Sequence, residues 1–120
     1  MIDIGANLGL FSLRCVELGA KQVIAVEANP HVYIDLLEYV KPYPQITPMN
    51  KAVFSIDNRT VLIYNAHVGS RIEKEGDPVQ TITLNSIVKD IQDDNMILKL
   101  DCEGAEYDIC LLYTSDAADE

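Results

Sequence analysis

Long apolar runs and basic residues are both scarce in this 120-residue sequence. No run approaches the roughly 18 apolar residues that a membrane-spanning helix needs. No signal-peptide pattern is present either, so we expect a cytoplasmic protein with no membrane partner. Lysine and arginine number 9 against 19 acidic residues, which gives a net charge of −10. A surface of this sign repels phosphate backbones, so we expect no nucleic-acid partner.

Cysteine is also sparse. Cys15, Cys102 and Cys110 are odd in number and match no metal-binding or redox spacing, so we expect reduced and mostly buried thiols. An apolar fraction of 48% with 23% charged residues is ordinary for a globular protein. The length allows one small domain.

The start of the chain organises the rest. Ile2 and Ile4 end a short strand, and Gly5 to Gly9 form a turn that leads into an apolar, helix-like run from Leu10 to Leu18. Glycine has no Cβ, so the backbone can turn sharply there and come close to a ligand. A helix that begins near Leu8 points its N–H groups at whatever lies over the turn. Strand, turn and helix together are typical of the ligand-binding corner of an open α/β sheet.

Strand-like and helix-like runs alternate along the rest of the chain. This alternation predicts right-handed crossovers and a parallel sheet, and therefore an α/β fold. In the first helix, Leu8, Phe11, Cys15 and Leu18 follow helical spacing, and in the second helix we expect an inward face made by Val32, Leu36, Leu37 and Val40. Beyond this corner we expect strands over residues 23–26, 49–54, 61–64, 79–84 and 96–101, helices over 29–40 and 85–91, and a long loop over 67–77.

Glu27 ends the second expected strand. Adjacent parallel strands end at the same edge of a sheet, so Glu27 should lie beside the glycine turn, where an acid can accept two hydrogen bonds from a ribose diol. The alternative is that Glu27 is simply a solvated residue at the end of the strand. Dinucleotide-binding dehydrogenases use G-x-G-x-x-G, but Asn7 stands in place of the middle glycine. This argues against an NAD-dependent oxidoreductase, which is kept as an alternative.

Three ordered motifs resemble those of FkbM-type methyltransferases, which are class I methyltransferases that use S-adenosylmethionine. The stretch from Asp3 to Gly9 (DIGANLG) resembles the first motif of that family, and Val26 to Pro30 (VEANP) resembles the second. The stretch from Ile97 to Glu106 (ILKLDCEGAE) closely resembles the K-I-D-x-E-G-A-E signature. Asn85 is a departure, because the family usually has aspartate there. The resemblance covers roughly residues 1–110.

The resemblance implies an S-adenosylmethionine-dependent methyltransferase that methylates an oxygen of a small-molecule or sugar acceptor. It also implies a Rossmann-like, mainly parallel sheet, with helices on both faces and its first strands in the spatial order 3-2-1-4. Glu27 would hold the ribose hydroxyls, Asp3 would face the methionine amino group directly or through water, and a residue from Asn50 to Ala52 would border the adenine. The implied cofactor-binding residues are Asp3, Gly5, Ala6, Asn7, Gly9, Glu27 and Ala28.

Asp101 is the candidate catalytic residue, because it ends the last expected strand at the same sheet edge. Asp101 could make a polar contact to the substrate or cofactor, or it could act as a general base, and the sequence does not decide between these roles. Lys99 lies on the same face of that strand, two residues earlier. A buried lysine needs a partner, and Asp101, Asp3 or a neighbouring acid can provide one.

Other polar residues have simpler interpretations. Four acids suit a hard cation such as magnesium, but acids are also favoured in the first turn of a helix, so we expect no metal: Asp101, Glu103, Glu106 and Asp108. His67 is either a general base or an ordinary loop residue, and His31 is expected to be structural or solvated.

We expect residues 1–112 to form a partial methyltransferase domain, because such sheets contain further strands. Residues 113–120 have no apolar pattern and read as a non-native-looking or disordered tail. A truncated domain that binds the cofactor without catalysis is therefore a further alternative.

Overall fold

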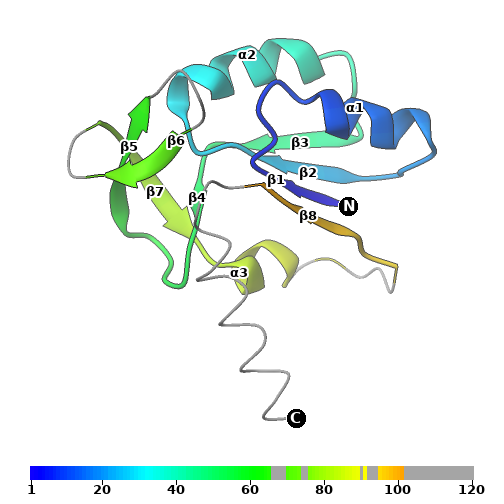
Figure 1. The fold of residues 1–120 in the computed structure, drawn as a ribbon. Helices are drawn as coiled ribbons and strands as arrows, with labels where there is room; N and C mark the ends of the chain where they lie inside the picture. The colour runs from blue at the N-terminus through cyan, green and yellow to red at the C-terminus, as the bar shows by residue number, and fades with distance from the viewer. Residues whose placement is uncertain (66–69, 74–75, 90, 92–94, 102–120) are drawn as a thin grey trace, which may run out of the picture.

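A four-stranded parallel sheet forms the centre of the fold (Figure 1). The computed structural model describes residues 1–65, 70–73, 76–89, 91 and 95–101. Neighbouring strands pair in parallel throughout this sheet. Its strands lie in the order β3 (Ile46–Met49), β2 (Val23–Val26), β1 (Ile2–Ile4) and β8 (Leu98–Leu100). The expected α/β class and the order 3-2-1-4 are confirmed, with β8 as the fourth parallel strand.

Helices cover both faces of this sheet, as expected. Among the described residues, α1 (Leu10–Glu17) and α2 (Pro30–Val40) lie on one face and the short helix α3 (Leu84–Val88) lies on the other (Figure 1). Side chains alternate across a strand, so Val23 and Ala25 of β2 pack in the core with α2, whereas Ile24 and Val26 pack in the core with α3. A strand buried on both faces is uniformly apolar for this reason.

A second sheet follows the first three parallel strands along the chain. Its order is β4-β7-β5-β6, with β5 antiparallel to both of its neighbours and β4 parallel to β7. These strands are β4 (Ala52–Val53), β5 (Thr60–Asn65), β6 (Ser70–Glu73) and β7 (Asp77–Ile82). The expected loop over 67–77 is therefore wrong for β6, and the expected strand over 49–54 is divided between β3 and β4. Glycines and charges gave the region a loop-like composition, but strand formation depends more on pairing with a neighbour than on composition.

The first helix differs from its expected form. It begins at Leu10 rather than near residue 8. Phe11 and Leu18 follow the apolar helical spacing, but both are exposed. Ser12 is buried instead, because its hydroxyl donates a hydrogen bond to the buried Asp3. Apolar spacing alone could not identify an inward face that is set by a polar contact.

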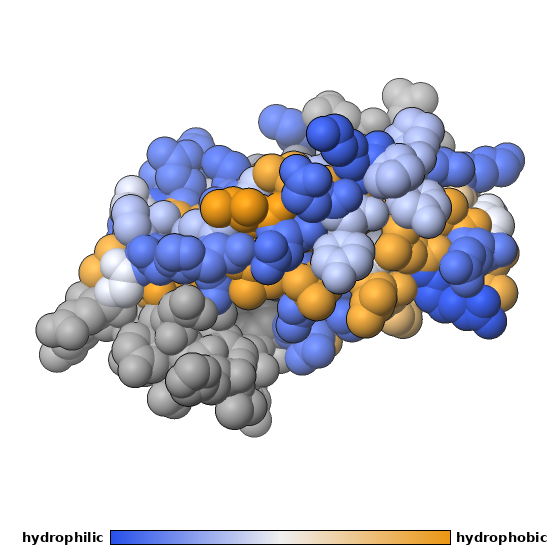
Figure 2. Space-filling model, turned by 90° about the horizontal axis from the view of Figure 1, so that it is seen from above, coloured by the Kyte–Doolittle hydropathy of each residue, from blue (hydrophilic) through white to orange (hydrophobic). Residues whose placement is uncertain are grey.

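Apolar side chains are exposed on the face of the molecule formed by α1 and α2. Figure 2 looks onto this face and shows apolar residues interspersed with polar ones. The exposed apolar residues of the two helices and their ends are Leu10, Phe11, Leu18, Ile34, Leu37 and Tyr39. In α2, Leu36 and Val40 are buried as expected, whereas Leu37, also expected to face inward, is exposed. Cys15 of α1 is half-buried and free. No helix in the described part of the chain is long and apolar enough to span a bilayer.

The second helix begins where the sequence predicts. Asn29 is its N-cap and Pro30 its first residue. The side-chain oxygen of Asn29 accepts hydrogen bonds from the backbone N–H groups of His31 (3.0 Å) and Val32 (3.4 Å). Because Asn29 is 1% exposed, water has little access to replace these bonds.

Replacing Asn29 by alanine should lower the free energy of unfolding by about 1–2 kcal/mol, the upper part of the range for a lost N-cap. Thr83 provides a control, because it caps the five-residue α3 from a half-buried position. Thr83→Ala should cost less, about 0.5–1 kcal/mol. Urea denaturation of both variants would measure the difference. A larger loss for Thr83→Ala would contradict the importance of burial at the cap of α2.

Candidate functional site

The turn between β1 and α1 contains three left-handed residues. The φ angles are 79° at Gly5, 54° at Asn7 and 89° at Gly9. Glycine adopts such angles without steric cost, and asparagine tolerates them better than most residues. The middle position of this turn therefore accepts Asn7 in place of a glycine.

The N–H groups of this turn are bonded within the protein. Gly5 and Ala6 both donate to the carbonyl oxygen of Val26 (2.8 and 3.0 Å), and Gly9 donates to the carbonyl oxygen of Ala6 (2.9 Å). Asn7 donates to the carboxylate that follows β2. Ligand contacts from these four residues would therefore come from their carbonyl groups or side chains, or from their Cα surface. The contacts themselves stay predictions.

Gly9 has a second role, in the packing of α1 against α2. A Cβ atom at this position would lie 2.8 Å from Leu36 Cδ1 and 3.1 Å from Val40 Cγ1. Both of these α2 residues are buried in the core. Glycine is thus required at residue 9 by its backbone angle and by the close approach of the second helix.

Glu27 lies directly after β2 and is 8% exposed, so it is not a solvated strand terminus. One carboxylate oxygen accepts a hydrogen bond from Asn7 N (2.9 Å), and the other accepts one from Asn29 N (2.8 Å). Each oxygen of an ionised carboxylate has two acceptor sites, so the contacts of the described residues leave one site on each. The carboxylate can therefore accept two further donors from a ligand.

Burial raises the pKa of Glu27 above its usual value of 4.5. The N–H groups of Asn29 and Asn7 lower this pKa, as does the charge of Lys99, while the charge of Asp3 raises it. The net shift is upward, which means that folding disfavours the charged form of Glu27. A positively charged ligand beside it would favour that form.

Asp3 forms a polar cluster under the turn. It is 0% exposed, and Ser12 Oγ of α1 donates a hydrogen bond to its Oδ2 atom (2.7 Å). Lys99 Nζ of β8 lies 3.1 Å from the Oδ1 atom. This second contact is an ion pair without hydrogen-bond geometry, because Oδ1 has no hydrogen-bond partner in the described part of the chain. Asp3 is therefore a partner of Lys99, and its predicted contact with a ligand amino group stays a prediction.

The ends of neighbouring parallel strands are linked in a row. Asp101 N donates to Ile4 O (2.9 Å), Gly5 N donates to Val26 O (2.8 Å), and Glu27 N donates to Met49 O (3.0 Å). These bonds bring Asp101, the glycine turn and Glu27 to one edge of the sheet, as the sequence predicts for adjacent strands. Asp101 itself is exposed at this edge.

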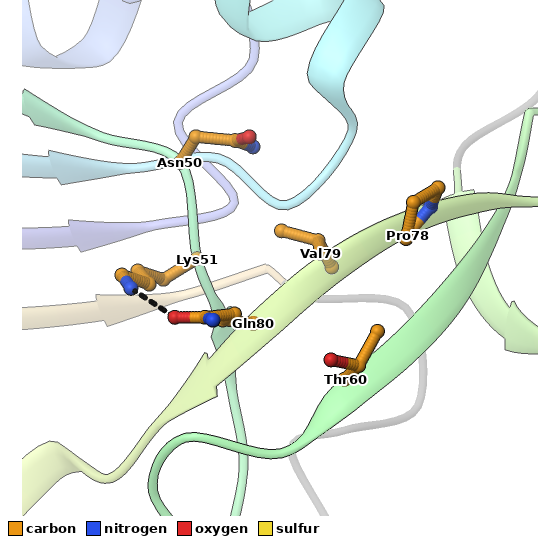
Figure 3. A pocket seen from close by; sticks show the side chains of 6 residues that line it. All are labelled: Asn50, Lys51, Thr60, Pro78, Val79 and Gln80. Atoms are coloured by element: carbon orange, nitrogen blue, oxygen red, sulfur yellow. Dashed lines mark hydrogen bonds between the residues drawn. The ribbon is translucent and has the colours of Figure 1, made fainter.

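An open cavity of about 410 Å³ lies beside this edge (Figure 3). Asn50 connects the cavity to the sheet edge, because its Nδ2 atom donates to the carbonyl oxygens of Glu27 (2.9 Å) and Ala28 (3.1 Å). The lining residues are Asn50, Lys51, Thr60, Pro78, Val79 and Gln80. Sequence reasoning pointed to residues 50–52 but missed the lining from β5 and β7, because it did not anticipate the second sheet.

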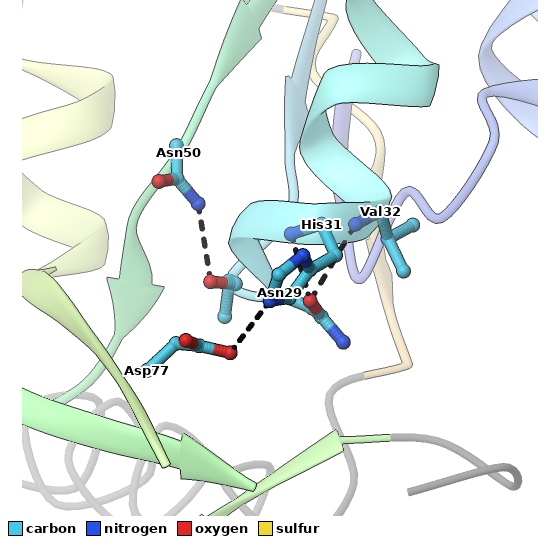
Figure 4. Close-up of polar contacts among 6 residues, drawn as sticks. Asn29, His31, Val32, Asn50 and Asp77 are labelled. Atoms are coloured by element: carbon cyan, nitrogen blue, oxygen red, sulfur yellow. Dashed lines mark hydrogen bonds and ion pairs between the residues drawn. The ribbon is translucent and has the colours of Figure 1, made fainter. Parts of the chain in front are cut away.

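Polar contacts also join α2 to the second sheet (Figure 4). His31 Nε2 lies 2.9 Å from Asp77 Oδ2 at the start of β7, where the side chain of His31 is 61% exposed and that of Asp77 is 40% exposed. The described residues contain no group of three potential metal ligands. Several residues considered from the sequence lie outside the described residues: His67, Cys102, Glu103, Glu106, Asp108, Cys110 and the tail 113–120.

Comparison with known families gives a clear match. The family model described as the methyltransferase FkbM domain matches residues 3–118, nearly the whole chain. A comparison with curated proteins and one with solved structures gave no match. The matched range contains the glycine turn, Glu27 and Asp101, and it confirms the resemblance that the motifs indicate.

Proposed function

Because this chain belongs to the FkbM methyltransferase family, we propose that it binds S-adenosylmethionine at the sheet edge and methylates an oxygen atom of a small-molecule or sugar acceptor. The observation that carries the proposal is the carboxylate of Glu27. It is nearly buried, it accepts a hydrogen bond from the glycine turn, and within the described part of the chain each of its oxygens keeps one acceptor site. The two hydroxyls of a ribose are donors of the kind that such a carboxylate accepts.

The charge of the edge supports the same ligand. S-adenosylmethionine carries a positive sulfonium, a positive ammonium group and one carboxylate, and its net charge at neutral pH is therefore positive. The edge presents Glu27 and the exposed Asp101, and the N–H groups of Gly5, Ala6, Asn7 and Gly9 in the glycine turn are bonded internally. Carbonyl groups and carboxylates accept hydrogen bonds from cations and attract their charge. The residues present therefore fit a cationic, diol-bearing cofactor.

The alternative nicotinamide cofactor fits this edge less well. A dinucleotide carries a pyrophosphate, which dinucleotide-binding folds hold with N–H groups of the glycine turn and the following helix. Here the N–H groups of Gly5, Ala6, Asn7 and Gly9 are already bonded within the protein. The acids at the edge would also repel the two phosphates.

S-adenosylmethionine, when bound, supplies an electrophilic methyl group. The contribution of the chain is mainly alignment, since placing two reactants in line removes much of the entropic cost of their meeting. We propose that Glu27 orients the ribose. Asn50, which lines the cavity of Figure 3, would lie beside the adenine. Asp101 is exposed beside the start of the turn, where we propose a polar contact to the acceptor hydroxyl.

Calorimetric titration of the chain with S-adenosylhomocysteine, and separately with NAD, tests the cofactor. We expect saturable binding of S-adenosylhomocysteine and at least a hundredfold weaker binding of NAD. Circular dichroism of the same sample establishes that it is folded. Tighter binding of NAD, or no binding of either ligand by a folded sample, would contradict the proposal. Methyl transfer from labelled S-adenosylmethionine to a panel of hydroxylated small molecules and sugars would then test the acceptor.

A further inference from the structure

We propose that Lys99 is a positioning residue: as the counter-ion of the buried Asp3, it compensates a charge that would otherwise distort the glycine turn, and so keeps this turn in the form that binds the cofactor. The cofactor part of this inference rests on the function proposed above. The part that concerns the turn stands on the contacts among β1, α1 and β8.

The register of the sheet places the two charges side by side. Asp3 of β1 is paired with Lys99 of β8, so both side chains leave the same face of the sheet. Their charged atoms are 3.1 Å apart, and the exposed fractions of the side chains are 0% for Asp3 and 27% for Lys99. A buried carboxylate without a partner is strongly destabilising, because it has lost its hydration. Lys99 supplies the partner from a strand that is distant in sequence.

Asp3 in turn clamps the glycine turn. Its Oδ2 atom accepts the hydroxyl of Ser12 at 2.7 Å, and these two residues flank the turn on either side. The bond therefore fixes the start of α1 relative to the end of β1. Asn7, between them, donates its N–H to Glu27, which ties the same turn to the carboxylate assigned to the ribose. A shift of Asp3 would thus be transmitted to both ends of the turn.

Lys99 also contacts the helix directly. Its Nζ atom lies 5.1 Å from the centre of the Phe11 ring, a distance at which a cation is attracted to an aromatic face. Phe11 is the residue before Ser12, so the two contacts of Lys99 join β1 and the first turn of α1. Phe11 is exposed, and this contact joins its ring to Lys99.

The pair also affects the charge of the ribose-binding carboxylate. Among the charged groups that act on Glu27 in the described part of the chain, Asp3 of β1 raises its pKa and Lys99 of β8 lowers it. His31 of α2 is paired with Asp77 instead. Removing Lys99 alone would leave two neighbouring acids without their cation, so the pKa of Glu27 should rise further.

Amide hydrogen exchange of the full chain tests the turn without any ligand. In Lys99→Met we expect at least tenfold faster exchange at Asn7, relative to amides paired between β2 and β3. The conservative variant Lys99→Arg and the uncharged double variant Asp3→Asn/Lys99→Met should both exchange like the wild type. Lys21→Met is the matched control, because it removes an exposed lysine from the connection between α1 and β2.

Calorimetric titration with S-adenosylhomocysteine measures the affinity and its pH dependence, and a purely structural role of Lys99 would leave the pH dependence unchanged. Lys99→Met should bind at least tenfold more weakly, and the pH at which its affinity falls should be higher than in the wild type. Lys99→Arg should restore both the affinity and the pH dependence. If the wild type binds no S-adenosylhomocysteine, the proposed function fails, while the exchange measurement still decides whether Lys99 holds the turn.

Each result of the exchange measurement either supports or overturns the proposal. A folded Lys99→Met variant with wild-type exchange at Asn7 would overturn the proposal. If Lys99→Met does not fold, the double variant decides, because it removes both charges together. A folded double variant with a protected turn supports the counter-ion role. A double variant that also fails to fold, or that folds with an unprotected turn, overturns it.

Discussion

Replacing Gly9 by alanine should lower the free energy of unfolding by about 2–5 kcal/mol, which would leave a domain of this size largely unfolded if its total stability is near the lower end of the usual range. Two independent costs add. The backbone has a φ of 89°, which disfavours any residue with a Cβ atom, and that atom would lie 2.8 Å from Leu36 Cδ1. The α2 core cannot move away without disturbing its own packing.

Gly19 provides the matched control for this experiment. Its φ is also positive, at 105°, but a Cβ atom there would meet no heavy atom within 4 Å. Gly19→Ala should therefore show the backbone cost alone, about 1–2 kcal/mol. Urea denaturation followed by circular dichroism measures both variants. Equal losses at the two positions would mean that the contact with α2 adds nothing, and that the packing role of Gly9 is wrong.

Replacing Glu27 by glutamine should weaken binding of S-adenosylhomocysteine by tenfold to a hundredfold at neutral pH, or roughly 1.5–3 kcal/mol. Glutamine offers one acceptor oxygen where the carboxylate offers two. Its amide nitrogen would face one of the two backbone donors, Asn7 N or Asn29 N, which now bond the carboxylate. Calorimetric titration is the measurement, with the exposed Glu38→Gln of α2 as the control. Unchanged affinity in a folded Glu27→Gln variant would remove Glu27 from the site.

As the pH falls, the ionisation of Glu27 should change the free energy of unfolding and the ligand affinity in opposite directions. Because its pKa is raised in the folded chain, its contribution to stability is fully present below the unfolded value and is lost as the pH rises through the folded value. The stability of the wild type relative to Glu27→Gln should therefore increase as the pH falls from neutral toward 4.5, the usual value. Ligand affinity should decrease over the same range, because the protonated acid accepts less strongly. A relative stability that falls on acidification would contradict the raised pKa.

The sequence predicted the parts of the fold that repeat a simple pattern. The apolar run Val23–Val26 has no polar face, and such a strand is buried on both sides, so helices on both faces followed. Asn29 and Pro30 marked the start of α2 because their side chains favour a helix start through local chemistry. The common edge of Glu27 and Asp101 followed from the parallel arrangement of adjacent strands.

Features that depend on distant contacts were less visible. The strand β6 exists through its pairing with β5, and β4 has only two residues, so neither carries a clear periodicity of its own. The packing role of Gly9 depends on Leu36 of another helix, and the buried face of α1 depends on the bond between Ser12 and Asp3. A glycine turn read from sequence suggests a ligand, but in the structure its N–H groups mostly serve the protein itself.

The position of β1 between β2 and β8 has a consequence for the order of folding. Loop closure costs more entropy when the paired segments are far apart along the chain. The pairing of β1 with β2 and of β2 with β3 is comparatively local, whereas β8 joins from nearly the other end of the described chain. During synthesis from the N-terminus, the glycine turn and Glu27 are therefore available early, while Asp3 stays without Lys99 until β8 has been made. Among the described strands of the parallel sheet, β8 is the last to be made, and it brings the counter-ion of Asp3 together with the acid that follows it at the sheet edge.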